Sequence, residues 1–371
     1  LAEVLFTELE KGVTSEAECL RHAAAAKQTL LSEDFVCPSW REVHNGVRPP
    51  EPEQSTEPGE VRHGWQYHAA SRRETHYREA VVFARRNRPS QALLRSQAGR
   101  CAGVHLTLFP LTEELQYENA KLRALLLRRL RLPLDLDTRR CKCGKALDSL
   151  GDHRAACSTG GVLQTRAVPL ERAWARVGRE AGARVQTHAY LNNLNVLNVE
   201  PSDERRLEVV ASGLPTYRGA QVAVDATLVS PLTRKGTARP RAHWQNGAAL
   251  KDARKKKEKH YPELQHSRRC RLVTAGMEVG GRWDEGAYEF LLELAAAKAQ
   301  QAPVVLRGSA TRAWLKRWGA LLSKAAMDSF ASTLVYGTAE RTHLWTSPTP
   351  ALGVVLCGAP EPPEVSRMGL R

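Results

Sequence analysis

Residues 220–232 read AQVAVDATLVSPL, and this run constrains the fold more than any other part of the chain. A short apolar stretch, rich in valine and bounded by turn residues, is typical of a strand buried inside a sheet. Asp225 lies in the middle of the run. An unpaired carboxylate is very costly to bury, so this one needs a partner. The stretch therefore predicts both a sheet and a charged site within it.

The segments around this strand alternate between helical and strand-like patterns. Residues 168–182 favour a helix with Pro169 in its first turn and Gly182 after its end. Further elements are expected as a strand over 206–211, the strand over 220–229, a helix over 246–261, a strand over 270–279, and a helix over 284–300 capped by Asp284. This order predicts an α/β fold in which helices cover both faces of a small mixed sheet.

A hairpin between the first two strands places two carboxylates opposite each other. Its loop, SGLPTYRG, is centred between Thr216 and Tyr217, so Glu208 and Asp225 are equidistant from the centre. Directly opposed like charges destabilise a sheet unless a cation lies between them, and two hard carboxylates with room for water suit Mg²⁺. Two structural alternatives remain open: a bulge that leaves Asp225 at a strand end, and a solvent-facing Glu208.

The helix over 246–261 contributes a lysine to the same site. At about 100° per residue, Lys257 and Tyr261 each lie about 20° from Leu250 on the apolar face, whereas Lys255 and Lys259 point away. The alternative for Lys257 is a side chain that extends out to solvent. Together, Glu208, Asp225 and Lys257 predict a phosphodiesterase site in which Mg²⁺ activates a water and Lys257 stabilises developing charge.

A second cluster, CKCGKALDSLGDHRAAC, contains cysteines and a histidine at metal-ligand spacing. Cys141 and Cys143 flank a tight turn, and His153 and Cys157 share one face of a helical turn that begins near Asp152. Three thiolates and one imidazole select Zn²⁺, and four protein ligands make the site structural. The alternative is a chance coincidence of these residues. Lys142, Lys145 and Arg154 are expected to present charge to a phosphate backbone.

The charge balance favours a nucleic-acid partner. Lys and Arg number 55 against 40 Asp and Glu, a net charge of +15, although a genome rich in G and C gives the same bias. No apolar run approaches the roughly 18 residues of a membrane span, and the first residues do not form a signal peptide. We expect a soluble intracellular protein with no membrane partner.

These motifs together resemble a known family. The segments CKCG…LDSLGDHRAAC, RRLEVVASGLP, AVDATLVSPL and ARKKKEKHYPEL are similar to the C-terminal region of non-LTR retrotransposon polyproteins, over roughly residues 129–334. The resemblance implies a Cys-Cys-His-Cys zinc knuckle followed by a restriction-like PD-(D/E)xK endonuclease. It implies zinc ligands Cys141, Cys143, His153 and Cys157, and catalytic residues Glu208, Asp225, Lys257 and Tyr261, with Glu208 and Asp225 binding Mg²⁺ or Mn²⁺.

The implied activity is nicking of chromosomal target DNA in the nucleus, so that the exposed 3′ end primes reverse transcription of the element RNA. The first motif reads Leu207-Glu208 and the second Asp225-Ala226-Thr227, and the chain has no Asp-Asp pair of a polymerase. Two other functions remain open: a non-catalytic zinc-containing module that binds DNA or RNA, and an inactive relic of a retroelement.

The domain organisation expected from these patterns has four parts. A mainly helical region over 1–130, with helices over 68–87 and 111–132 and a Pro/Glu-rich linker near 46–62, precedes a zinc-knuckle module over 131–165. The endonuclease domain occupies 166–305. Residues 306–371 form an amphipathic helix over 311–335 and a loose tail. In that helix, Trp314 and Trp318 share one side and Lys324 lies on another.

Overall fold

The computed structural model describes residues 64–84, 86–108, 113–134, 140–194, 196–337 and 349–357, with scattered positions between 17 and 47. Contacts divide the chain into two units, Leu1–Arg86 and Asn87–Arg371. In the first unit, α4 (Trp65–His76) continues into a π-helical segment, η1 (Tyr77–Phe83), so the helix predicted over 68–87 is confirmed through Phe83. Most of the first 63 residues, including nearly all of the predicted linker near 46–62, lie outside the described residues.

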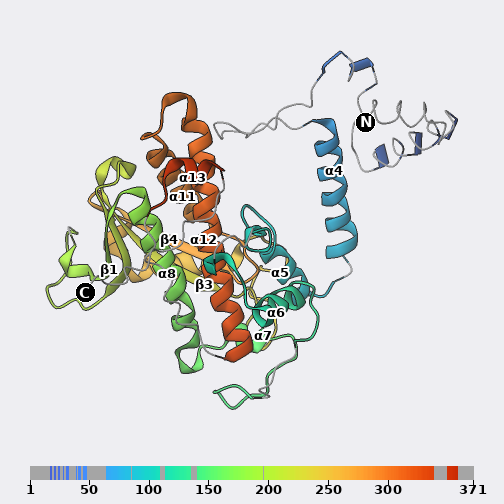
Figure 1. Ribbon diagram of the computed structural model, residues 1–371. Coiled ribbons are helices and arrows are strands. Elements are labelled where there is room, and N and C mark those ends of the chain that lie inside the picture. Colours follow the sequence, from blue (N-terminus) through green and yellow to red (C-terminus); the bar gives the residue numbers. More distant parts are fainter. Residues whose placement is uncertain are drawn as a thin grey trace, which may run out of the picture. The chain divides into compact units, whose positions relative to one another are not determined.

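The second unit is built on one four-stranded mixed sheet (Figure 1). Its strands are β1 (Arg184–Tyr190), β2 (Arg206–Ser212), β3 (Gln221–Val229) and β4 (Cys270–Glu278), in the order β1-β2-β3-β4. β1 and β3 each pair antiparallel with β2, and β4 pairs parallel with β3. The expected mixed α/β sheet flanked by helices is confirmed. β1 was not predicted, because RVQTHAY lacks an apolar alternation and its side chains are largely exposed.

Helices cover both faces of this sheet. The main helices are α5 (Arg88–Ser96), α6 (Asn119–Arg129), α7 (Asp152–Ala156), α8 (Val162–Ala181), α9 (Ala248–His260), α10 (Pro262–Gln265), α11 (Glu285–Ala299), α12 (Arg307–Tyr336) and α13 (Leu352–Cys357). Val224 of β3 belongs to a core formed with α8, α11 and α12, whereas its neighbour Ala223 packs with Tyr261 and Leu264 at the α9–α10 side. β3 is therefore the internal strand that its apolar sequence predicts.

Two helices differ from their predicted form. α8 begins at Val162, so Pro169 lies inside the helix and not in its first turn, while Gly182 ends the helix in the left-handed conformation at φ 102° as predicted. α12 was expected to be an amphipathic helix with a charged side. It is instead buried almost all round from Trp318 to Leu334, and Lys324 is only 6% exposed, because α12 packs against α6, α8 and α11 at once (Figure 1).

Short single-turn segments complete the second unit. They are η2 (Val104–Leu106), η3 (Glu113–Leu115), η4 (Thr159–Gly161), η5 (Leu191–Asn193), η6 (Thr216–Gly219) and η7 (Val304–Leu306). The helix predicted over 111–132 is therefore shorter than expected. It consists of η3 and α6, separated by an extended stretch that ends at the helix cap Glu118.

Candidate functional site

The hairpin of β2 and β3 brings Glu208 and Asp225 opposite each other. The paired residues are Val209 with Val224, Val210 with Ala223 and Ala211 with Val222, and the same register continued by one residue pairs Glu208 with Asp225. The predicted register is thus confirmed. The Glu208 carboxylate accepts a hydrogen bond from the backbone N–H of Ala226. Glu208 therefore points toward β3 at the position where the backbone ladder between the two strands ends.

Asp225 forms an ion pair with the lysine that the helical-face argument selected. Lys257 Nζ lies 2.6 Å from Asp225 Oδ1, and Asp225 is 1% exposed. Along α9, Lys255 and Lys259 are exposed, whereas the Lys257 side chain is only 30% exposed. The prediction that Lys257 turns inward toward Asp225 is confirmed.

The carboxyl groups of this cluster resist ionisation. Burial, followed by the charges of Asp225 and Glu171, raises the pKa of Glu208 to about 9. Burial also raises the pKa of Asp225, although Lys257 opposes the shift. A carboxylate whose charge is destabilised by burial is stabilised strongly when it binds a proton or a metal ion. Two oxygen-rich side chains in this state suit a hard divalent cation such as Mg²⁺.

Glu171 on α8 is a third member of the cluster, and the sequence analysis did not find it. It is 9% exposed, and burial together with the charge of Asp225 raises its pKa to about 7. A signal was present in the sequence. Glu171 lies three, four and seven residues before Trp174, Ala175 and Gly178, all of which are buried on the same side of the helix. A charge on an apolar helix face is the same signal that identified Lys257.

Tyr261, predicted to be catalytic, is held against β2. It is 4% exposed in the smaller core, and its hydroxyl donates a 2.8 Å hydrogen bond to the carbonyl of Arg206. Burial and the charges of Asp225 and Glu208 raise the pKa of Tyr261. The hydroxyl is therefore engaged with the backbone of β2, where it fixes the end of α9 beside the strand that carries Glu208.

The four predicted zinc ligands come together in one place. Among the described residues, Cys141, Cys143, His153 and Cys157 form a group whose potential ligand atoms all lie within 4.8 Å of one another. The Sγ atoms of Cys141 and Cys157 are 3.8 Å apart, and two sulfurs bound tetrahedrally to zinc at about 2.3 Å are also about 3.8 Å apart. This group has the donor set and spacing of a structural zinc site.

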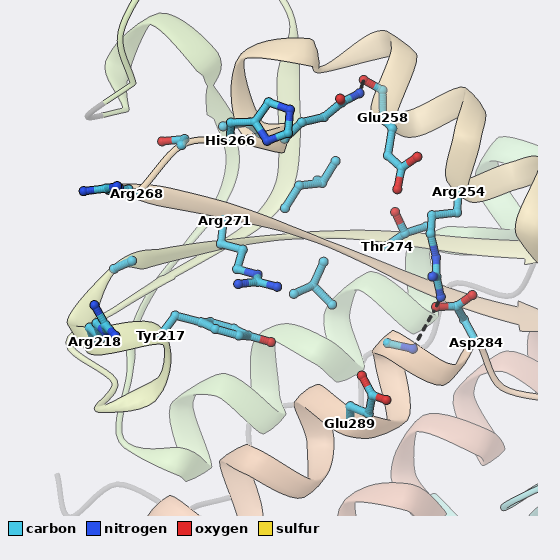
Figure 2. Close-up of a pocket in the computed structure, with 17 residues that line it drawn as sticks. Tyr217, Arg218, Arg254, Glu258, His266, Arg268, Arg271, Thr274, Asp284 and Glu289 are labelled. Carbon is cyan, nitrogen blue, oxygen red and sulfur yellow. Dashed lines mark hydrogen bonds and ion pairs between the residues drawn. The ribbon is translucent and has the colours of Figure 1, made fainter.

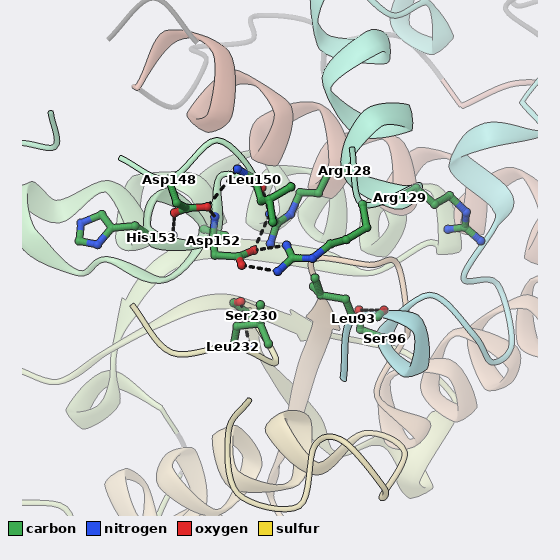
Figure 3. Close-up of polar contacts among 12 residues, drawn as sticks. Leu93, Ser96, Arg128, Arg129, Asp148, Leu150, Asp152, His153, Ser230 and Leu232 are labelled. Carbon is green, nitrogen blue, oxygen red and sulfur yellow. Dashed lines mark hydrogen bonds and ion pairs between the residues drawn. The ribbon is translucent and has the colours of Figure 1, made fainter. Parts of the chain in front are cut away.

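The local backbone orients these ligands as expected. Gly144 adopts φ 81° at the end of the turn that begins at Cys141 and contains Cys143, and α7 begins at Asp152. Asp148 accepts hydrogen bonds from the backbone N–H groups of Leu150, Asp152 and His153, which fixes the start of this short helix (Figure 3). Hydrogen bonds from Thr159 lower the pKa of Cys157 to about 7 even though burial opposes ionisation. Cys157 is thereby prepared to act as a thiolate ligand.

His153 also has the outer partner that a metal-bound imidazole needs. Its Nδ1 lies 3.0 Å from the carbonyl oxygen of Arg234, and its Nε2 lies 3.2 Å from Cys143 Sγ. A proton on Nδ1 donated to Arg234 leaves the Nε2 lone pair for the metal. Arg234 belongs to the loop that follows β3, so the cluster is bonded directly to the loop between β3 and α9.

One expectation about the surface of this module is wrong. Lys142 and Lys145 are exposed as predicted, but Arg154 is 9% exposed and donates to the carbonyl of Leu334 in α12. Arg154 therefore anchors the module to the core and does not face a phosphate backbone. The last carbonyls of α12 have no N–H donor within the helix, so a buried guanidinium that donates to one of them is favourable.

Buried arginines fasten the rest of this module. Arg128 and Arg131 bind Asp152 at 3.0 and 2.6 Å (Figure 3). Arg166, which is fully buried, donates to the carbonyls of Ala155 in α7 and Leu228 in β3, both at 2.9 Å. These bonds join the candidate zinc module to the strand that carries Asp225.

The loop between β3 and α9 exposes one large aromatic side chain. Trp244 is 58% exposed, and Arg241, Lys251 and Lys255 nearby in the sequence are exposed as well. Arg95 of α5 donates a 3.0 Å hydrogen bond to the carbonyl of His243, which fixes this loop. An exposed tryptophan with basic residues nearby in the sequence is the combination of side chains that nucleic-acid-binding proteins use to stack on bases.

Comparisons with known proteins do not identify the chain: no protein-family model matches it, and a search of curated proteins gives no match. Within the described residues, no helix is both long enough and apolar enough to cross a membrane.

Proposed function

We propose that the chain is a metal-dependent DNA endonuclease with a restriction-like fold and a structural zinc module. The observation that carries this proposal is the constellation of Glu208, Asp225 and Lys257. Two carboxylates beside one lysine at the end of a strand ladder are costly for the fold alone, because burial raises the pKa of both Glu208 and Asp225. A divalent cation resolves the repulsion between Glu208 and Asp225.

The chain's own residues have separate roles in phosphodiester hydrolysis. Glu208 and Asp225 would hold Mg²⁺ or Mn²⁺, which would polarise the phosphate and acidify a water. Lys257 would stabilise the negative charge that develops on the phosphate oxygens. Glu171 accepts a proton at its carboxylate, which a pKa of about 7 permits near neutral pH. Tyr261 positions α9 against β2 through its bond to Arg206.

The biological role follows from the resemblance to retrotransposon polyproteins. In this role the endonuclease nicks nuclear target DNA, and the free 3′ end primes reverse transcription of the element RNA. The net charge of +15 and exposed Lys142, Lys145 and Trp244 support a nucleic-acid partner.

The test is cleavage of supercoiled plasmid DNA with Mg²⁺ or Mn²⁺. We expect wild type to nick the plasmid, and Asp225→Ala, Glu208→Gln and Lys257→Met each to reduce the rate about 100-fold or more. Lys259→Met is the matched control, since Lys259 is an exposed lysine of the same helix. Equal cleavage by wild type and Asp225→Ala, or no cleavage by wild type, contradicts the catalytic proposal.

A second candidate function is nucleic-acid binding without catalysis, and exposed Trp244 is the observation that favours it. Base stacking predicts that Trp244→Ala weakens binding of an oligonucleotide about tenfold, while Trp244→Phe retains most of the affinity. Binding measured by fluorescence anisotropy should also fall steeply with salt. Binding without cleavage in the wild type would favour this function, or an inactive relic, over the nuclease.

A further inference from the structure

One edge of the sheet is open along half of its length. In the ladder between β3 and β4, Gln221 N–H donates to the carbonyl of Arg269, and Val279 N–H donates to the carbonyl of Val229, both at 2.9 Å. These bonds show that odd-numbered residues of β4 direct their backbone groups toward β3. Because backbone groups of successive residues alternate in direction, even-numbered residues direct theirs to the outer edge.

Among the described residues, the chain covers only the C-terminal half of this edge. Gly276 accepts a 2.8 Å hydrogen bond from Asp284 N–H, and Glu278 N–H donates to the carbonyl of Arg282 at 2.8 Å. Leu272 and Thr274 point the same way, but within the described residues their backbone N–H and C=O groups have no hydrogen-bond partner. Two donors and two acceptors therefore remain at the N-terminal half of β4.

This open edge forms the floor of a pocket of about 1070 Å³ (Figure 2). Both Leu272 and Thr274 line it, between α9 and α10 on one side and η6 and α11 on the other. Thr274 is 7% exposed, so the edge is recessed and not flush with the surface. A second copy of the protein cannot pair with this edge through its own β4, because that strand is recessed to the same extent. A single extended chain can enter the recess.

The charges on the pocket walls are unevenly placed. Arg218 and Arg268 are exposed at one end, and neither forms an ion pair with a described residue. Arg271 lies beside them over the ring of Tyr217 at 4.5 Å. At the deeper end Arg254 is paired with Asp284. Glu258 and Glu289 line the pocket away from the exposed arginines (Figure 2), so the positive charge available to a ligand lies at the Arg218 and Arg268 end.

We propose that this pocket binds an extended acidic peptide of a partner protein, which adds to β4 as a further strand. The open edge offers donors and acceptors in alternation, and a peptide main chain complements both. A phosphodiester backbone only accepts, so it leaves the carbonyls of Leu272 and Thr274 unpaired. The three arginines favour acidic residues at the peptide end that lies beside Arg268. The proposal is independent of the nuclease function.

The test uses a fluorescein-labelled peptide, acetyl-Asp-Glu-Val-Thr-Val-Thr-amide, with the full chain in an anisotropy titration. A Lys-Lys analogue of its first two residues tests the charge. Leu272→Pro removes one outward N–H and leaves the ladder to β3 intact, since that N–H faces away from β3. Leu272→Ala is the matched control, because it removes the side chain and keeps the N–H.

We expect the labelled peptide to bind saturably. Leu272→Pro should weaken this binding about tenfold or more relative to Leu272→Ala, because it removes one hydrogen bond to the peptide and disturbs the adjacent ones. The double variant Arg218→Ala with Arg268→Ala should weaken binding of the acidic peptide but not binding of its lysine analogue. A peptide N-methylated at alternate residues should also fail to bind, which tests main-chain pairing without a protein variant. No binding at millimolar peptide, equal binding of the N-methylated peptide, or displacement by single-stranded oligonucleotide overturns the proposal.

Discussion

Glu278 is a buried carboxyl group with little to stabilise its charge. It ends β4 and is 2% exposed, and the nearest cation is Arg282 Nε at 3.6 Å. The Arg282 guanidinium is already committed, since its Nε and Nη2 both donate to the carbonyl of Arg95. Burial therefore outweighs Arg282 and raises the pKa of Glu278 from 4.5 to about 7. Glu278→Gln keeps the shape and removes the ionisation.

The sign of the effect on stability follows from proton binding. Between pH 4.5 and about 7 the folded state holds a proton on Glu278 that the unfolded chain releases. The free energy of unfolding therefore falls as pH rises through this window. The size of the shift corresponds to about 3 kcal/mol when Glu278 is fully ionised in the folded state. Glu278→Gln should thus stabilise the protein by up to about 3 kcal/mol at pH 8 and change little at pH 4.

The measurement is urea unfolding of wild type and Glu278→Gln at several pH values. The difference in unfolding free energy between the two proteins should grow as pH increases from 4 to 8. Glu289→Gln on α11 serves as the control, because it makes the same substitution at an exposed glutamate. A difference between wild type and Glu278→Gln that is the same at pH 4 and pH 8 refutes the reasoning.

Three further predictions concern other parts of the second unit. Burial and the charge of Arg129 lower the pKa of His105 from 6.5 to about 4, so stability should fall as pH decreases through this range, and urea unfolding of His105→Gln should remove that dependence. Gly281→Ala should lower the melting temperature far more than Gly213→Ala: both glycines have positive φ, but a Cβ at Gly281 collides with the carbonyl of Ala102 and one at Gly213 meets open space. His153→Ala should lose bound zinc, measured by metal analysis, and melt at lower temperature, whereas Lys145→Ala should retain both zinc and stability.

The parts of the site that sequence could predict depend on local geometry. The register of Glu208 and Asp225 follows from the loop centre, and Tyr217 and Arg218 at that centre adopt φ 49° and 59°, the left-handed conformation that closes a tight turn. Lys257 follows from helical periodicity. The zinc ligands follow from spacing, because each pair is held by a single turn of backbone.

The parts that sequence could not predict depend on contacts between distant segments. Pro169 indicated a helix start, but the seven residues before it are helical, since Arg166 at 0% exposure is held by α7 and β3 and fixes that turn. Lys324 looked like a surface residue, yet its Nζ lies 4.3 Å from the ring centroid of Tyr117, and its partner Asp328 also pairs with Lys121 of α6 at 3.6 Å. A charge that is compensated by its tertiary environment leaves no periodic signal, so burial of these residues was not predictable.

The two candidate metal sites are connected more closely than their separation in sequence indicates. The sequence analysis assigned the zinc ligands and the carboxylates to different domains. In the structure, Arg166 donates to the carbonyl of Ala155 in the last turn of α7 and to the carbonyl of Leu228, three residues beyond Asp225 on β3. His153 bonds to Arg234 in the loop that follows the same strand. Loss of zinc would free the His153 ring and the end of α7, and both connections end on the segment that positions Asp225. The zinc module is therefore best understood as a support for the carboxylate site, because it fixes the strand from which one of the proposed magnesium ligands projects.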